Sequence, residues 1–348
     1  MWQWPGMPSV AYRRSGTTDR RVHEKKNDQQ LTAMTTITPP ENPKDAAYTR
    51  HDRRDPRNTN TDRSQMNVIS SKTIVLIHGQ WVTPSSWEKF KGYFESRGRK
   101  VIASPWPGIN KDVVAMRRDP SSLNGIGIED LVAHYTTIIR GLSEPPIIMG
   151  HSFGGLIAQL LIDKGFGAAG VAIDSVPPKG ILVLPLSTYL ALTPVFLQPS
   201  TFKKTFIFTF EKWWKVFART LSESEARGEF EREVVPAPGR AIFQAALSNV
   251  TPNSTATINF RNNARAPLLF ICGEKDVLMP AALNRKNFRK YAASSAITEY
   301  QEFPGRSHYI IAEKGWEEVA QYALDWALAK SSSVQIQTEA DMISKERS

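Results

Sequence analysis

The chain is poor in cysteine and lacks an uninterrupted apolar run suited to a membrane span. Its one cysteine, Cys272, excludes an intrachain disulfide framework and any zinc site built from several cysteines. A chain without disulfides suits a reducing compartment, so we expect a cytoplasmic protein. The N-terminus shows no basic segment followed by an apolar one, so we expect no secretory signal peptide.

The net charge of +10 does not indicate a nucleic-acid partner. Residues 1–72 hold 13 Lys and Arg against 8 Asp and Glu, a net charge of +5, which is half of the total. The other half is spread over the rest of the chain, without a basic stripe interleaved with aromatic residues. We therefore interpret the basic residues as a solvated surface and expect no nucleic-acid binding.

The order of the elements predicts an α/β protein between two unstructured ends. Residues 1–71 are rich in Arg, Asp, Asn, Thr and Pro and cannot bury enough apolar surface to fold, and the polar tail 331–348 is also expected to be flexible. Between them, short apolar runs alternate with amphipathic segments, which predicts a mostly parallel sheet with helices on both faces over residues 72–330. The predicted strands are 73–77, 101–103, 146–149, 170–173, 267–271 and 297–300, and the predicted helices are 128–142, 155–164 and 316–329.

Residues 179–255 interrupt this alternation and are longer than a simple crossover requires. Their apolar run at 181–197 contains Pro185 and Pro194, and it is near the lower length limit of a spanning helix. We favour a helical cap over the site, ahead of a lid that dips into a membrane and of a true span. The cap holds aromatic residues that either bind an apolar substrate or simply pack the cap onto the core, namely Phe206, Phe210, Trp213 and Trp214.

Ser152 is the candidate nucleophile. It lies in Gly150-His151-Ser152-Phe153-Gly154, directly after a predicted strand and before a predicted apolar helix. In that context the G-x-S-x-G pattern indicates a sharp turn that lifts the serine hydroxyl off the sheet. A side chain at either glycine would collide with the neighbouring strand or helix.

A serine hydroxyl needs a base to accept its proton and an acid to orient that base. Of the six histidines, only His308 lies in a loop directly after the last predicted strand, where it can reach the serine. Asp276, in the loop after strand 267–271, is the favoured acid. Asp174 and Glu274 remain alternatives, since both also follow strands at the same edge of the sheet.

The developing negative charge of the reaction requires two backbone N–H groups. Phe153, directly after the serine, is expected to supply one of them. The loop after His78-Gly79 supplies the other, with Gln80 as the first choice and Trp81 as the second. The side-chain amide of Gln80 is also available to the substrate.

Residues 72–330 resemble the α/β-hydrolase superfamily. The resemblance rests on His78-Gly79, the segment 150–155, Gly273-x-x-Asp276 and the segment 305–308, which occur in the family's order. It implies a central sheet of about six to eight strands and a cap inserted after the sixth strand. No pair of strands precedes Thr73, so the smaller sheet of plant methylesterases and hydroxynitrile lyases is the nearer likeness.

The predicted function is hydrolysis of a carboxylic ester of a small to medium apolar substrate through an acyl-enzyme, without a metal or cofactor. The same residues also suit a thioesterase or a lyase acting on a secondary metabolite, because one scaffold hosts many reactions. A lipase working at a membrane surface and a non-catalytic, ligand-binding relative are further alternatives. The sequence does not decide the oligomeric state.

Overall fold

The computed structural model describes residues 71–182 and 185–346, with side chains up to Ser331. The predicted N-terminal extension, residues 1–71, lies outside these ranges except for Ser71.

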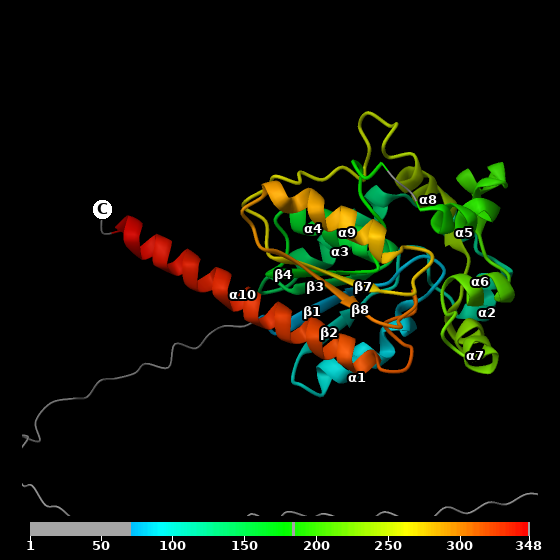
Figure 1. Cartoon of the computed structure of the whole chain (residues 1–348), viewed down its shortest axis with the longest axis horizontal. Coiled ribbons are helices and arrows are strands. Elements are labelled where there is room, and N and C mark those ends of the chain that lie inside the picture. Colours follow the sequence, from blue (N-terminus) through cyan, green and yellow to red (C-terminus); the bar gives the residue numbers. More distant parts are fainter. Residues whose placement is uncertain (1–70, 183–184, 347–348) are drawn as a thin grey trace, which may run out of the picture. The chain divides into compact units, whose positions relative to one another are not determined.

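Six parallel strands form the central sheet, in the order β2-β1-β3-β4-β7-β8 (Figure 1). Most of them are the apolar runs found in the sequence, because a strand covered on both faces has no polar side. This confirms the predicted fold class. The strands are β1 (Thr73–Ile77), β2 (Lys100–Ala103), β3 (Ile147–His151), β4 (Ala169–Ile173), β7 (Leu268–Gly273) and β8 (Thr298–Phe303).

Helices cover both faces of the sheet (Figure 1). Side chains alternate along a strand, so β1 sends Ile74 and Leu76 into one apolar cluster and Val75 and Ile77 into the other. The first cluster lies under α1 (Glu88–Glu95) and α10 (Trp316–Glu346). The second lies under α3 (Ile128–Arg140) and α4 (Phe153–Asp163), with α9 (Ala281–Lys290) on the same side.

The insertion between β4 and β7 is helical, as predicted. It contains α5 (Leu186–Phe196), α6 (Phe210–Val216), α7 (Glu223–Glu233), α8 (Gly239–Ala246) and a two-stranded ribbon of β5 (Thr205–Phe206) and β6 (Ala237–Pro238). It follows the fourth strand of the sheet in the described chain rather than the sixth. The predicted position came from the resemblance to the family, whose larger members have a pair of strands before the one that corresponds to β1.

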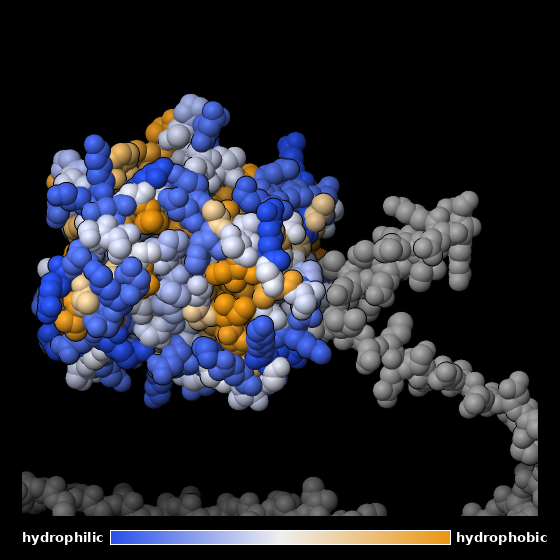
Figure 2. All heavy atoms as spheres, turned by 180° about the vertical axis from the view of Figure 1, so that it is seen from behind, coloured by the Kyte–Doolittle hydropathy of each residue, from blue (hydrophilic) through white to orange (hydrophobic). Residues whose placement is uncertain are grey.

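None of the helices in the described ranges is long and apolar enough to cross a membrane. The apolar run at 181–197 instead contributes α5, which Pro185 precedes and which contains Pro194. The face drawn in Figure 2 is mostly hydrophilic, with several separate hydrophobic patches.

The last helix is longer than predicted. α10 continues past residue 329 to Glu346, because residues 330–346 contain no glycine or proline to stop it. The segment predicted as a flexible tail, 331–348, is therefore helical up to Glu346, and residues 347–348 lie outside the described chain. The sequence analysis did not predict α1, α9 or the short α2 (Val113–Arg118), which are short segments with several charged residues.

Candidate active site

Ser152 sits on a strained turn between β3 and α4. Its φ of 56° lies in the left-handed region, which costs a non-glycine residue free energy and marks functional turns. A Cβ on Gly150 would lie 2.0 Å from the carbonyl oxygen of Gly154, and a Cβ on Gly154 would lie 2.0 Å from that of Ile77. Both glycines are therefore required for the close approach of strand and helix.

His308 connects the serine to an acid. Its Nε2 lies 2.9 Å from Ser152 Oγ, and its Nδ1 lies 2.6 Å from Asp276 Oδ2. All three side chains are buried. The other carboxylate oxygen of Asp276 accepts hydrogen bonds from the backbone N–H groups of Leu278 at 2.7 Å and Met279 at 2.9 Å, which fix the carboxylate in place.

The two alternative acids make other contacts. Asp174 Oδ1 accepts a hydrogen bond from the Gly273 backbone at 2.8 Å, and its Oδ2 has no hydrogen-bond partner among the described residues. Burial, and then the nearby charge of Asp276, raise the pKa of Asp174 well above its ordinary value. Glu274 is exposed and accepts a hydrogen bond from the Gly305 backbone at 2.8 Å. Of the three candidates, only Asp276 forms a hydrogen bond with His308.

The loop after β1 lies directly against the nucleophile. A Cβ on Gly79 would come within 2.9 Å of Ser152 Cβ, so only glycine permits this approach. Gln80 and Trp81 follow at once, and Trp81 has a positive φ of 63°. On the other side, Phe153 is the first residue of α4, and its N–H has no acceptor within the helix. The structure thus brings the three predicted oxyanion residues to the nucleophile.

A pocket opens beside Ser152. Its cavity volume is about 70 Å³, so the pocket is narrow and opens to solvent at its mouth. Gln80, Trp81 and Phe153 line it together with Ser152. The rest of its wall is almost entirely apolar and comes from the β4 edge, α5, α8 and the Asp276 loop, including Val176, Leu192, Phe196, Ile242, Leu278 and Met279.

Comparison with protein families agrees with this geometry. Residues 74–322 match the model of the Alpha/beta hydrolase family, which covers most of the chain. The chain belongs to the alpha/beta hydrolase family. The prediction of a hydrolase enzyme is thereby confirmed. Among curated proteins, no sequence matches the chain.

Solved structures of other alpha/beta hydrolases share the fold. Polyneuridine aldehyde esterase is 17% identical with a TM-score of 0.52, and the match covers 74% of this chain and 99% of that one. A pyrethroid hydrolase from Sphingobium faniae is 20% identical with a TM-score of 0.52, covering 74% and 97%. A monoacylglycerol lipase from Paleococcus ferrophilus is 19% identical with a TM-score of 0.52, covering 75% and 96%.

The aromatic residues proposed to bind substrate do not line the pocket of this hydrolase. Trp213 is fully buried and packs on Tyr309, and Phe210 stacks on Trp214. The backbone carbonyl of Phe206 accepts a hydrogen bond from the indole of the pocket residue Trp81 at 3.0 Å. The pocket beside Ser152 therefore gives the substrate-binding assignment no support, and the assignment stays a prediction. The apolar wall comes from α5 and α8 instead.

Three residues that sequence reasoning did not assign to the site hold the His308 loop. His151 Nε2 donates to the His308 carbonyl at 2.7 Å, and burial keeps the pKa of His151 well below its ordinary value, so its ring stays neutral. Glu313 accepts hydrogen bonds from the Ser307 backbone at 2.9 Å and from its hydroxyl at 2.7 Å. The Phe217 ring of the cap packs edge-on against the imidazole of His308, with centroids 4.9 Å apart. Nothing in the local sequence signals these contacts.

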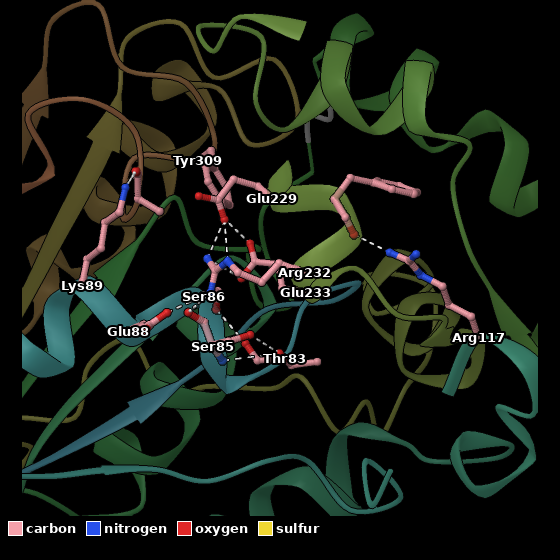
Figure 3. Close-up of polar contacts among 12 residues, drawn as sticks. Thr83, Ser85, Ser86, Glu88, Lys89, Arg117, Glu229, Arg232, Glu233 and Tyr309 are labelled. Carbon is pink, nitrogen blue, oxygen red and sulfur yellow. Dashed lines mark hydrogen bonds and ion pairs between the residues drawn. The ribbon is translucent and has the colours of Figure 1, made fainter. Parts of the chain in front are cut away.

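A polar cluster joins the cap to the His308 loop and to α1 (Figure 3). At the end of α7, the buried carboxyl group of Glu233 accepts a hydrogen bond from the hydroxyl of Tyr309, the neighbour of His308. Glu229 accepts from the same hydroxyl at 3.1 Å, and Arg232 bridges Glu229 to Glu88 on α1. The cap is thus bound to the His308 loop through side chains that share one small cluster.

One group of side chains in the described chain has the spacing of metal ligands. Ligand atoms of His151, Asp174 and His308 lie within 4.8 Å of one another. However, His308 is engaged with Ser152 and Asp276 on its two ring nitrogens, and His151 donates to a backbone carbonyl. These hydrogen bonds account for the grouping, and we assign no metal to it.

Proposed function

We propose that this alpha/beta hydrolase cleaves carboxylic esters of small to medium apolar substrates, with Ser152 as nucleophile, His308 as base and Asp276 as the acid that orients it. The observation that carries the proposal is the pair of short contacts that His308 makes at one edge of an apolar pocket. The names of the similar structures, which include an esterase, a pyrethroid hydrolase and a lipase, support ester chemistry.

In the first half of the reaction, His308 Nε2 takes the proton from Ser152 Oγ while this oxygen bonds the substrate carbonyl carbon. The negative charge moves to the carbonyl oxygen. The backbone N–H groups of Phe153 and of Gln80 or Trp81 donate hydrogen bonds to this oxygen and stabilise the charge. The C–O bond to the alcohol then breaks, and the imidazolium returns its proton to the departing oxygen. Asp276 stabilises the imidazolium during these steps.

In the second half, water replaces the alcohol. His308 takes a proton from the water as its oxygen attacks the acyl carbon of the acyl-enzyme. The bond between that carbon and Ser152 Oγ breaks, and the proton passes to Ser152, which leaves a carboxylic acid and free enzyme. The chemistry of these residues is complete without a cofactor.

The pocket supports an apolar substrate of limited size. Its wall offers little hydrogen bonding, so burial of hydrocarbon is the main source of binding free energy there, at roughly 25 cal/mol per Å² of apolar surface. The small-molecule partner, the absence of a nucleic-acid partner and the cytoplasmic location all stay predictions.

A series of p-nitrophenyl esters with acyl chains of increasing length tests the proposal. We expect turnover that rises and then falls with acyl length, and a loss of at least about 10⁴-fold in kcat for Ser152→Ala. A fluorophosphonate should add covalently to wild type and not to Ser152→Ala, as intact-mass measurement would show. Absence of turnover for all chain lengths would contradict the proposal.

A surface-active ester hydrolase is a second candidate, favoured by the outer side of the cap. Leu182, Leu186, Tyr189, Leu190 and Leu197 are exposed by 55–82%, and the exposed Lys203 and Lys204 follow them. Apolar side chains beside basic ones are typical of segments that lie on anionic membranes. A rise in activity when the substrate forms droplets, and co-flotation with anionic vesicles, would support this candidate over action on dissolved esters.

Thioesterase and lyase chemistry use the same residues and are separated by assay. Comparison of oxygen esters and thioesters with the same acyl chain tests for thioesterase activity. Cleavage of a cyanohydrin tests for lyase activity. If Ser152→Ala bound ligands normally and wild type turned none over, a non-catalytic binding protein would be the correct reading.

A further inference from the structure

Four side chains with polar atoms line the pocket, and only one of them lacks a partner. The Trp81 indole and the Thr188 hydroxyl each donate to a backbone carbonyl, at 3.0 and 2.7 Å, and Ser152 bonds His308. Neither the Oε1 nor the Nε2 atom of Gln80 has a hydrogen-bond partner among the described residues.

The cost of this arrangement is substantial. Gln80 is only 2% exposed, so its amide has largely lost contact with solvent. A buried amide without hydrogen bonds destabilises a folded protein, and most such groups are paired. When one is left unpaired in a ligand pocket, the group that completes it commonly belongs to the ligand.

The position of Gln80 limits what it can bind. It follows Gly79, whose backbone is in contact with Ser152, so its side chain starts at the point where the substrate carbonyl must lie. The Gln80 side chain is long enough to contact only those substrate groups that lie within a few bonds of the scissile carbonyl. The amide offers an N–H donor and a C=O acceptor together, and a hydroxyl is the small group that satisfies both.

We propose that Gln80 is a specificity-determining residue that selects esters in which a carbon two or three bonds from the scissile carbonyl carbon bears a hydroxyl group, in an otherwise apolar substrate. This inference rests on the proposed ester hydrolysis and narrows its substrate class. The hydroxyl donates to Oε1 and accepts from Nε2. The apolar wall of Leu192, Phe196 and Ile242 takes the remaining hydrocarbon.

Matched pairs of esters test the inference. The acyl side is probed with ethyl 3-hydroxybutanoate against ethyl butanoate, and the alcohol side with 2-hydroxyethyl butanoate against propyl butanoate. We expect wild type to favour the hydroxylated member of one pair in kcat/KM by about tenfold or more. The pair that shows this preference identifies the side of the ester that carries the hydroxyl.

Gln80→Met removes the amide and keeps the length and volume of the side chain. It should reduce the preference for the hydroxylated ester by about 10- to 100-fold, chiefly by slowing that substrate. Leu192→Met is the matched control, because it also introduces a methionine but at an apolar position of the pocket wall. It should affect both members of each pair alike and leave their ratio unchanged.

Stability gives a second readout that does not depend on activity. If the amide is unpaired in the free enzyme, Gln80→Met should raise the melting temperature by roughly 2–4 °C. A fall in melting temperature would show that Gln80 is paired in the free protein and would overturn the inference. An equal fall in kcat/KM for both esters of the pair in Gln80→Met would overturn the inference as well.

The outcomes also separate this inference from the proposed function. If wild type cleaves the unsubstituted esters but shows no preference that depends on Gln80, the inference fails and ester hydrolysis stands. If wild type cleaves none of the four esters and does not react with a fluorophosphonate, both fail.

Discussion

Glu233 has a fully buried carboxyl group, and its replacement by glutamine should change how the stability of the protein depends on pH. Burial raises the pKa of its carboxyl from 4.5 to about 8, although the hydrogen bond from Tyr309 and the charge of Arg232 lower it in part. Glu229 and Lys89 are the other charged groups that act on it. The carboxyl is therefore mostly neutral in the folded protein at pH 7 and ionised in the unfolded chain.

This difference makes stability depend on pH. Between pH 4.5 and about 8, the folded protein binds a proton at Glu233 that the unfolded chain has lost, so the free energy of unfolding falls as pH rises through this interval. At 1.36 kcal/mol per pH unit, the interval corresponds to at most roughly 5 kcal/mol, and we expect a loss between about 2 and 5 kcal/mol.

Glu233→Gln keeps the shape and the acceptor for Tyr309 but cannot ionise. Its free energy of unfolding should match that of wild type within about 1 kcal/mol at pH 4.5 and exceed it by about 2–5 kcal/mol at pH 9. Urea denaturation followed by tryptophan fluorescence at intervals from pH 4.5 to 9 measures both curves. The difference between them removes contributions from other titrating groups such as His78, whose pKa burial lowers to about 4.

Glu231→Gln is the matched control, since Glu231 lies on the same helix and is exposed. Its difference from wild type should not vary with pH by more than a few tenths of a kcal/mol. If the difference for Glu233→Gln were equally flat, Glu233 would ionise in the folded protein as it does in the unfolded chain, and the argument from burial would be refuted.

Three further predictions concern the site and its scaffold. Asp276→Asn should lower kcat by about 10⁴-fold because an amide favours the wrong tautomer of the histidine, whereas Asp174→Asn should cost less than about tenfold; steady-state kinetics on one ester decides between the two acids. Gly150→Ala places a Cβ 2.0 Å from the Gly154 carbonyl oxygen and should destabilise the fold by at least about 3 kcal/mol in urea denaturation, whereas retained stability would contradict the tight turn. Phe217→Ala should cost about 3–5 kcal/mol of unfolding free energy and also lower kcat, since its ring packs on His308, the proposed base; an unchanged kcat would show that this contact is structural only.

The local chemistry of this hydrolase could be predicted from the sequence. Most of the strands are apolar runs because they are covered on both faces. The two glycines around Ser152 predict the turn because a side chain at either position would collide with the backbone. His308 and Asp276 follow strands, and in a parallel sheet the loops after the strands share one edge. Residues far apart in the chain therefore meet by topology alone, which made their partnership predictable.

The tertiary structure alone decided which helices of the cap line the pocket, because this depends on the direction in which each helix packs. Both α5 and α6 contain several large apolar residues, yet side chains of α5 line the pocket and Trp213 of α6 packs on Tyr309. The choice of Asp276 over Asp174 rests on one hydrogen bond, because His308 Nδ1 lies 2.6 Å from Asp276 Oδ2 whereas Asp174 Oδ1 accepts from the Gly273 backbone. The unpaired amide of Gln80 and the buried acid Glu233 are likewise invisible in the sequence, because burial and hydrogen-bond partners come from segments that only folding brings together.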